Sequence, residues 1–266
     1  MTNITDISTF FATHTPLHLA EDWDNVGLLA GDPQQPVSRI MTCLTITAAS
    51  AEEAIRERAE LIVTHHPLPF KPLKRLTTEQ TPGRLLWSLA RAGVAIYSPH
   101  TAFDSAAMGI NQQLANGLGL TQIQPLVLTK NDLAGLGSGR VGTFAAPQAL
   151  RQVATKLAKF LKIDGLQLVG DPTATITKVA VACGSAGSFL PAAATAGCQL
   201  LVTGETTFHT CLEAESLGMS LLLPGHFASE RFACEQLAEV LAKEFPGLHV
   251  WASQTEKDPV KWMSLG

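Results

Sequence analysis

Short apolar runs alternate with longer amphipathic stretches along the chain, and this alternation is typical of parallel strands joined by helices. In the first part, apolar runs predict strands at 39–46, 59–64 and 94–98, and the stretches after them predict helices at about 49–58, 83–92 and 105–117. In the second part, the same pattern predicts strands at 178–183, 198–203 and 219–223 and helices at about 188–196, 207–217 and 228–244. The expected fold class is therefore α/β, with two similar halves.

The two series repeat each other in sequence as well as in pattern. A shift of 139 positions places Ala59–Thr64 on Cys198–Thr203 without a gap, and a shift of 126 places His100-x-x-x-Asp104 on His226-x-x-x-Glu230. This favours an internal duplication, with a first half at 1–123 and a second at 124–266. The segment 124–176, with a strand at IQPLVLT and a helix at 147–161, is expected to open the second half as a hairpin and helix.

Composition, charge and cysteine spacing argue against several classes of protein. The formal charge of −4 is spread along the 266 residues and no basic stripe appears, which argues against a nucleic-acid partner. No apolar run reaches the roughly 18 residues of a membrane-spanning helix. The N-terminal stretch predicts a short helix that begins at Thr5 or Asp6 and ends near Pro16, rather than a signal peptide. Five widely spaced cysteines without a CxxC pair are typical of a reducing compartment, so we expect a cytoplasmic protein.

Polar clusters follow the predicted strands, where loops and helix N-termini of a parallel sheet converge on ligands. His65-His66 follows the second strand of the first half, and His100 and Asp104 follow the third. In the second half the equivalent positions are Gly204-Glu205 with His209, and Gly225-His226 with Glu230.

The spacing within these clusters favours metal ligands. Residues four apart at the start of a helix share one face, and adjacent histidines in an extended segment are expected to point to opposite sides. Each motif alone is also typical of a structural role, such as helix capping, but four on equivalent strand ends favour a metal site. Imidazole and carboxylate together suit zinc, iron, manganese, cobalt or nickel. The turn CGSAGSF (183–189) is either an anion site or an ordinary tight turn.

Six stretches, in this order, resemble the Nif-three-like family, also called GTP cyclohydrolase 1 type 2 homologues. They are EDWDNVGLLAGDP (21–33), IVTHHPLPFKPLKRL (62–76), YSPHTAFDSAAMGINQQLANGLGL (97–120), GSGRVGTF (137–144), VTGETTFH (202–209) and PGHFASERF (224–232). The resemblance implies two α/β halves, a dinuclear metal centre between them, and a ring-like homohexamer.

The resemblance also implies roles for individual residues. His65, Asp104 and Glu230 would hold one ion, and His66, His226 and the same Glu230 the other. Glu205, His209 and His100 would lie near the metals as proton carriers or as partners of the ligands. The chain departs from the family at Thr45, where an aspartate is common, so any role of that aspartate is missing or reassigned here.

The leading functional interpretation is a metal-dependent hydrolase that opens a ring or cleaves a phosphoester of a small, nucleotide-like molecule. The alternative is a metal-binding assembly or regulatory protein without turnover that acts through protein contacts. Metal storage or delivery is a third reading. Glu205 and His209, which are not needed as ligands, favour catalysis.

Overall fold

The computed structural model describes residues 1–130, 132, 134–261 and 263. The chain contacts divide it into two compact units. The first unit holds residues 1–8, 27–98 and the residues from Cys234 onward, and the second holds 9–26 and 99–233. Two helices run from one unit into the other: α1 (Ile4–His14) and α9 (His226–Glu244).

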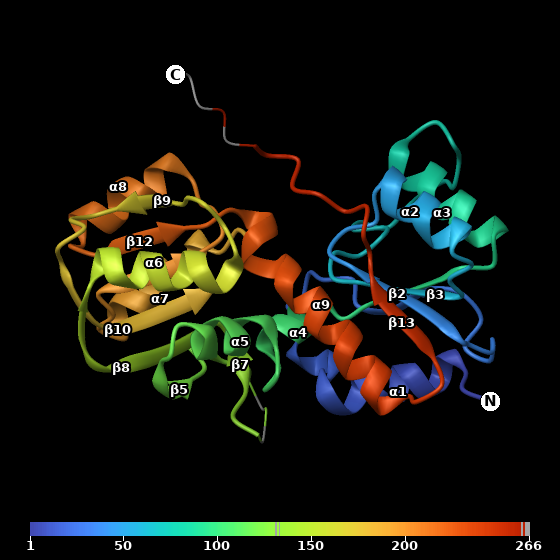
Figure 1. The fold of residues 1–266 in the computed structure, drawn as a ribbon, viewed down its shortest axis with the longest axis horizontal. Coiled ribbons are helices and arrows are strands. Elements are labelled where there is room, and N and C mark those ends of the chain that lie inside the picture. Colours follow the sequence, from blue (N-terminus) through green and yellow to red (C-terminus); the bar gives the residue numbers. More distant parts are fainter. Residues whose placement is uncertain (131, 133, 262, 264–266) are drawn as a thin grey trace. The chain divides into compact units, whose positions relative to one another are not determined.

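The first unit is built on a five-stranded sheet in the order β1-β4-β3-β2-β13. Its elements are β1 (Gly27–Ala30), β2 (Arg39–Cys43), α2 (Ala48–Arg56), β3 (Leu61–Thr64), α3 (Thr81–Arg91), β4 (Ala95–Ser98) and β13 (His249–Ala252). All pairs are parallel except β1 with β4. One face packs Met41, Ile62 and Ile96 against α2 and α3, which lie together in Figure 1. β3 is buried throughout because it lies inside the sheet.

The second unit carries a six-stranded sheet in the order β5-β8-β10-β11-β12-β9 (Figure 1). Its strands are β5 (Thr121–Gln124), β8 (Arg140–Ala149), β9 (Gln167–Val169), β10 (Thr175–Ala182), β11 (Leu200–Thr203) and β12 (Ser220–Leu223), and β6 (Val127–Leu128) pairs with β7 (Gly137–Ser138) beside them. Its helices are α4 (His100–Ser105), α5 (Ile110–Gly117), α6 (Leu150–Leu161), α7 (Leu190–Thr195) and α8 (Phe208–Ser216), with short 3-10 turns at Leu17–Leu19 and Gly187–Phe189. The core under α7 and α8 includes Leu190, Leu201 and Leu221.

The strand register repeats between the two units. Ile40 pairs with Leu61 in the first unit and Val179 with Leu200 in the second, and the shift of 139 maps one pair onto the other. An antiparallel strand also flanks the third parallel strand of each series, since β1 pairs with β4 and β9 with β12. The predicted duplication fits this arrangement.

The third strands are related by a shift of 125, because Leu61 faces Ala95 and Leu200 faces Ser220. The shift that relates His100 to His226 is 126, one larger than the shift of the strands. The second unit therefore has one more residue than the first between this strand and the histidine. Pro99 is followed directly by His100, whereas Gly225 separates Pro224 from His226.

Two expectations change in the structure. The single helix predicted at 105–117 is wrong: α4 ends at Ser105 and α5 begins at Ile110, because the backbone is extended at Ala106 and Gly109 between them. Residues 9–26 and 99–123, assigned by sequence to the first half, belong to the second compact unit, and the residues from Cys234 onward, assigned to the second half, belong to the first unit. The division at 123/124 stays a prediction about the repeat.

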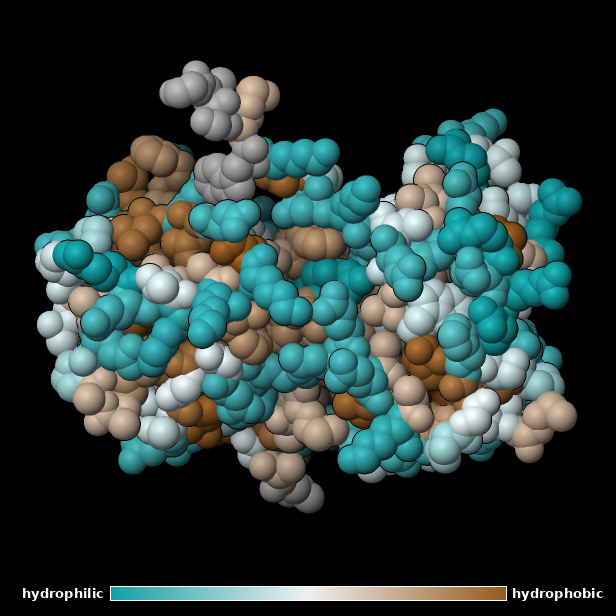
Figure 2. All heavy atoms as spheres, in the orientation of Figure 1, coloured by the Kyte–Doolittle hydropathy of each residue, from teal (hydrophilic) through white to brown (hydrophobic). Residues whose placement is uncertain are grey.

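Figure 2 shows that one face of the surface mixes hydrophilic and hydrophobic side chains, with hydrophobic atoms over the region of α8. Phe208, Leu212 and Leu217 are the exposed apolar residues of this helix and its end. Within the described part of the chain, every helix is too short or too polar to cross a membrane.

Candidate metal centre

His65 and His66 follow β3 on a backbone that the sheet holds firmly. Their N–H groups donate to the carbonyl oxygens of Cys43 (3.0 Å) and Leu44 (2.8 Å), which extends the β2–β3 ladder past the strands. The two residues form a bend, and their ring centroids lie 5.0 Å apart with a nitrogen of each ring within 4.8 Å of the other. We expected these adjacent histidines to point to opposite sides of an extended segment. The rings lie closer together than that, because the strand ends at Thr64.

The ring of His66 is oriented by Thr45. Thr45 Oγ1 lies 2.7 Å from His66 Nδ1, and the backbone N–H of Thr45 donates to Glu256 Oε1 at 2.6 Å. The position where the family often has aspartate is therefore in contact with a histidine that we predicted as a ligand.

His226 and Glu230 occupy the first turn of α9 and share one face, as their spacing predicted. Nε2 of His226 lies 3.1 Å from Glu230 Oε2, and Nδ1 lies 2.9 Å from Oε1 of Glu205, which follows β11. Hydrogen bonds to Glu230 and Glu205, together with their negative charge, raise the pKa of His226 to about 9 despite its burial. A bound cation would replace the proton at Nε2.

Asp104 is held in the second unit by a closed set of hydrogen bonds. The Cys183 thiol donates to Asp104 Oδ1 at 3.2 Å, the Cys183 N–H donates to Asn111 Oδ1 at 2.7 Å, and Asn111 Nδ2 donates to the Asp104 carbonyl oxygen at 3.2 Å. Burial and the nearby Glu230 carboxylate raise the pKa of Asp104 well above its ordinary value. Two carboxylates that disfavour each other's charge, a buried Glu230 and a half-buried Asp104, with an imidazole against Glu230, fit a divalent cation.

Gly184, in the turn after β10, makes room for the Glu230 carboxylate. Its φ is +65°, and an added Cβ would overlap Glu230 Oε1 and approach His226 Nε2 to 3.4 Å. The Gly184 N–H donates to Ser229 Oγ (3.0 Å), and the Gly184 carbonyl oxygen accepts from the Glu205 N–H (3.0 Å). The turn therefore brings its backbone close to the start of α9.

His100 is buried and bound to Asp24, a residue that the sequence patterns did not single out. His100 Nδ1 lies 2.7 Å from Asp24 Oδ1, and Asp24 also accepts from the backbone N–H and hydroxyl of Thr101. Burial opposes the charge of Asp24, but these hydrogen bonds lower its pKa to about 2. Asp24 lies in the EDWDN stretch that carries part of the family resemblance, and this was the signal that could have identified it.

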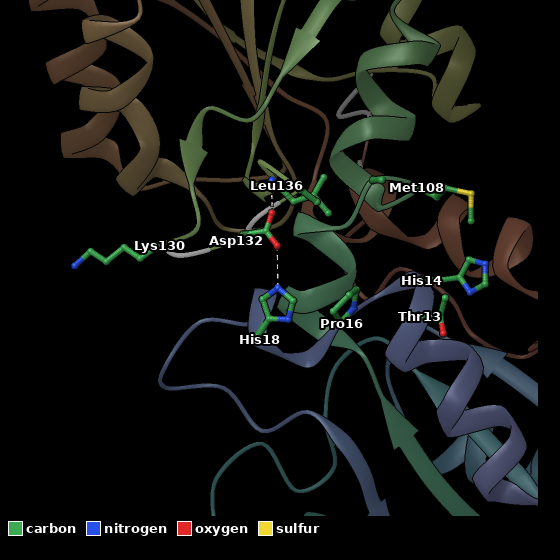
Figure 3. Close-up of a pocket in the computed structure, with 10 residues that line it drawn as sticks. Thr13, His14, Pro16, His18, Met108, Lys130, Asp132 and Leu136 are labelled. Carbon is green, nitrogen blue, oxygen red and sulfur yellow. Dashed lines mark hydrogen bonds and ion pairs between the residues drawn. The ribbon is translucent and has the colours of Figure 1, made fainter.

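His209 and a cavity of the second unit are separate from the contacts described above. His209 is exposed on the first turn of α8, with its ring centroid 5.9 Å from that of Phe208. A cavity of about 690 Å³ lies in the second unit between His14, Met108 and the His18–Asp132 ion pair (Figure 3). None of the eight predicted site residues lines it, so it gives no support to the metal chemistry.

Each unit therefore carries histidine or carboxylate groups that could hold a metal ion. The first unit supplies His65 and His66, and the second supplies His226, Glu230 and Asp104. The assignment of these five as ligands stays a prediction.

The chain is similar to known proteins of one family over most of its length. The chain matches the model of the family Duf34/NIF3 (NGG1p interacting factor 3) over residues 2–259. It is 30% identical to a "GTP cyclohydrolase 1 type 2 homolog" of Clostridium perfringens (98% of this chain, 99% of that protein). It is 32% identical to a protein of that name from Streptomyces coelicolor (97% and 94%), and 33% identical to "Protein NIF3 homolog" of Schizosaccharomyces pombe (92% and 92%).

Solved structures share the fold. A Bacillus cereus protein related to NIF3 superposes with a TM-score of 0.88 at 23% identity, covering 99% of both chains. Reduced HcgD from Methanocaldococcus jannaschii gives 0.82 at 25% identity, covering 94% of this chain and 97% of that one. The predicted α/β class and the resemblance are thereby confirmed, and the chain belongs to the Duf34/NIF3 family.

Proposed function

We propose that this protein is a metal-dependent hydrolase that holds two divalent transition-metal ions with His65, His66, Asp104, His226 and Glu230. The observation that supports this most directly is the pair of carboxylates in the second unit, the buried Glu230 and the half-buried Asp104, with His226 against Glu230 at 3.1 Å. Such a pair is costly to bury without a positive charge, and a bound cation supplies one.

The chemistry of the proposed reaction depends on the ions and on the residues around them. Two bound ions would lower the pKa of a water and polarise the scissile group of a substrate. Glu205 holds His226 through Nδ1, and Asp24 holds His100 in the same way, so these carboxylates orient imidazoles. His209 is exposed and so could exchange a proton with substrate or solvent.

The names of the relatives support a substrate with a nucleotide-like ring or phosphoester, since several are called GTP cyclohydrolase 1 type 2 homologs. The name NGG1p interacting factor 3 supports the second candidate, a metal-binding protein that acts through protein contacts.

A substrate panel separates the two candidates. Protein loaded with zinc, manganese, iron, cobalt or nickel is incubated with GTP and a series of phosphoesters. We expect metal-dependent turnover that His209→Ala lowers without changing the metal content, whereas His18→Ala, an exposed histidine on the separate cavity, leaves turnover unchanged. Tight metal binding with no turnover of any substrate would replace the hydrolase by the non-catalytic candidate.

A further inference from the structure

In three histidines of the candidate centre, Nδ1 lies at hydrogen-bond distance from a side-chain oxygen, but the chemical kind of that oxygen differs. His226 Nδ1 meets the Glu205 carboxylate at 2.9 Å, and His100 Nδ1 meets the Asp24 carboxylate at 2.7 Å. His66 Nδ1 meets a hydroxyl, that of Thr45, at 2.7 Å. A carboxylate fixes the Nδ1–H tautomer because it can only accept, whereas a hydroxyl can donate or accept. The position of the Thr45 hydroxyl beside His66 therefore matters, and it depends on another source of support.

That source lies in the C-terminal segment. Both oxygens of the Glu256 carboxylate accept from the loop after β2: Oε1 from the Thr45 N–H at 2.6 Å and Oε2 from the Leu44 N–H at 2.9 Å. The Leu44 carbonyl in turn accepts from the His66 N–H at 2.8 Å. Glu256 is thus hydrogen-bonded to two residues that contact His66, Thr45 at its ring and Leu44 at its backbone.

The segment that carries Glu256 is itself anchored. The Glu53 carboxylate on α2 accepts from Ser253 Oγ (2.7 Å), from the N–H of Gln254 (3.0 Å) and from the N–H and hydroxyl of Thr255 (3.1 and 2.7 Å). Glu53 is 2% exposed and Ser253 3% exposed. The residues just before Glu256 are therefore fixed against the same unit that carries His66.

We infer that Thr45 and Glu256 are positioning residues for His66. In this arrangement Thr45 Oγ1 accepts a hydrogen bond from His66 Nδ1–H, so that Nε2 is the nitrogen offered to a metal. Glu256 holds the loop by its backbone N–H groups and so places the Thr45 hydroxyl. The inference rests on the proposed metal centre only for its functional consequence.

The first test reads the metal-free protein. Nitrogen NMR of the neutral imidazoles at alkaline pH, with His66 identified by its loss in His66→Gln, reports which ring nitrogen carries the proton. We expect the Nδ1–H tautomer in the wild type and in Thr45→Ser, and a shift towards Nε2–H in Thr45→Val, which removes the hydroxyl at nearly constant shape. Thr155→Val, an exposed threonine on α6 that bonds only its own helix, is the matched control.

The second test reads metal affinity by competition with a chelator, with zinc as the probe. Loss of an outer partner of a ligating histidine typically weakens binding by about 10–100-fold, and we expect this for Thr45→Val. Glu256→Ala should weaken zinc by about tenfold, because the loop loses both acceptors but keeps the hydroxyl. Thr45→Ser and Glu239→Ala, an exposed carboxylate on α9, should bind as the wild type does.

The outcomes separate the two proposals. If the wild type binds no zinc, the proposed function is refuted. The NMR measurement of the His66 tautomer then still tests whether Thr45 positions His66. A wild type that binds zinc, together with an unchanged tautomer and unchanged affinity in Thr45→Val, overturns the inference.

Discussion

Gly184 shows how one backbone position shapes the candidate centre. Its φ of +65° favours glycine, and its missing Cβ leaves the place that Glu230 Oε1 occupies. We expect Gly184→Ala to lower the free energy of unfolding by about 1 kcal/mol, the usual cost of that backbone conformation. Because the Glu230 carboxylate is the flexible end of a side chain, it should move aside, and the variant should lose metal.

Gly197→Ala is the matched control for this prediction. Gly197 has a similar φ of +72°, and nothing lies within 4 Å of an added Cβ. Thermal unfolding should therefore shift alike in the two variants, while metal content falls only in Gly184→Ala. Equal metal content in both would show that Gly184 is needed for the turn alone.

The site residues differ in how far the sequence could predict them. His65, His66, Glu205, His226 and Glu230 follow apolar runs directly, so the rule of strand ends finds them. Asp24, Thr45 and Glu256 act through contacts with residues 21 to 211 positions away in the chain. No local pattern encodes such pairings, because each depends on how distant segments pack.

At the scale of elements, Glu53 ties β13 and the residues after it to α2. Its burial would raise the pKa, but hydrogen bonds from Ser253, Gln254 and Thr255 lower the pKa of Glu53 from 4.5 to about 2. The folded state thus favours the charged form, so the stabilisation is complete above pH 4.5 and is lost as pH falls towards 2. Glu53→Gln should cost about 2 kcal/mol at pH 7.

Denaturant unfolding of wild type and Glu53→Gln between pH 7 and pH 2.5 measures this. The difference in unfolding free energy should be constant down to about pH 5 and then shrink. A difference that does not change with pH would mean that the carboxylate charge contributes nothing. Glu239→Gln, on the exposed side of α9, should show little difference at any pH.

The central strands of both units follow from the apolar pattern, whereas the edge strands do not. β2, β3 and β4 and their counterparts β10, β11 and β12 are buried apolar runs, which periodicity detects. β1, β9 and β13 are short, partly exposed strands at sheet edges. Their sequences lack a distinctive pattern, and they form because a neighbouring strand offers unpaired backbone groups.

At the scale of the whole molecule, the resemblance predicts a ring-like homohexamer. The exposed apolar residues of α8, with Phe208 72% exposed, are consistent with a surface that another chain covers. Light scattering should give a mass about six times the 28.3 kDa of one chain. A mass of one chain across the accessible concentration range would contradict the ring.

The central claim is the proposed assignment of His65, His66, Asp104, His226 and Glu230 as the ligands of two metal ions. Metal analysis of the purified protein after zinc loading and desalting tests it most directly, with Glu230→Ala compared against Glu239→Ala on the same helix. We predict about two ions per chain in the wild type and in Glu239→Ala, and loss of both ions in Glu230→Ala. Unchanged metal content in Glu230→Ala would contradict the account.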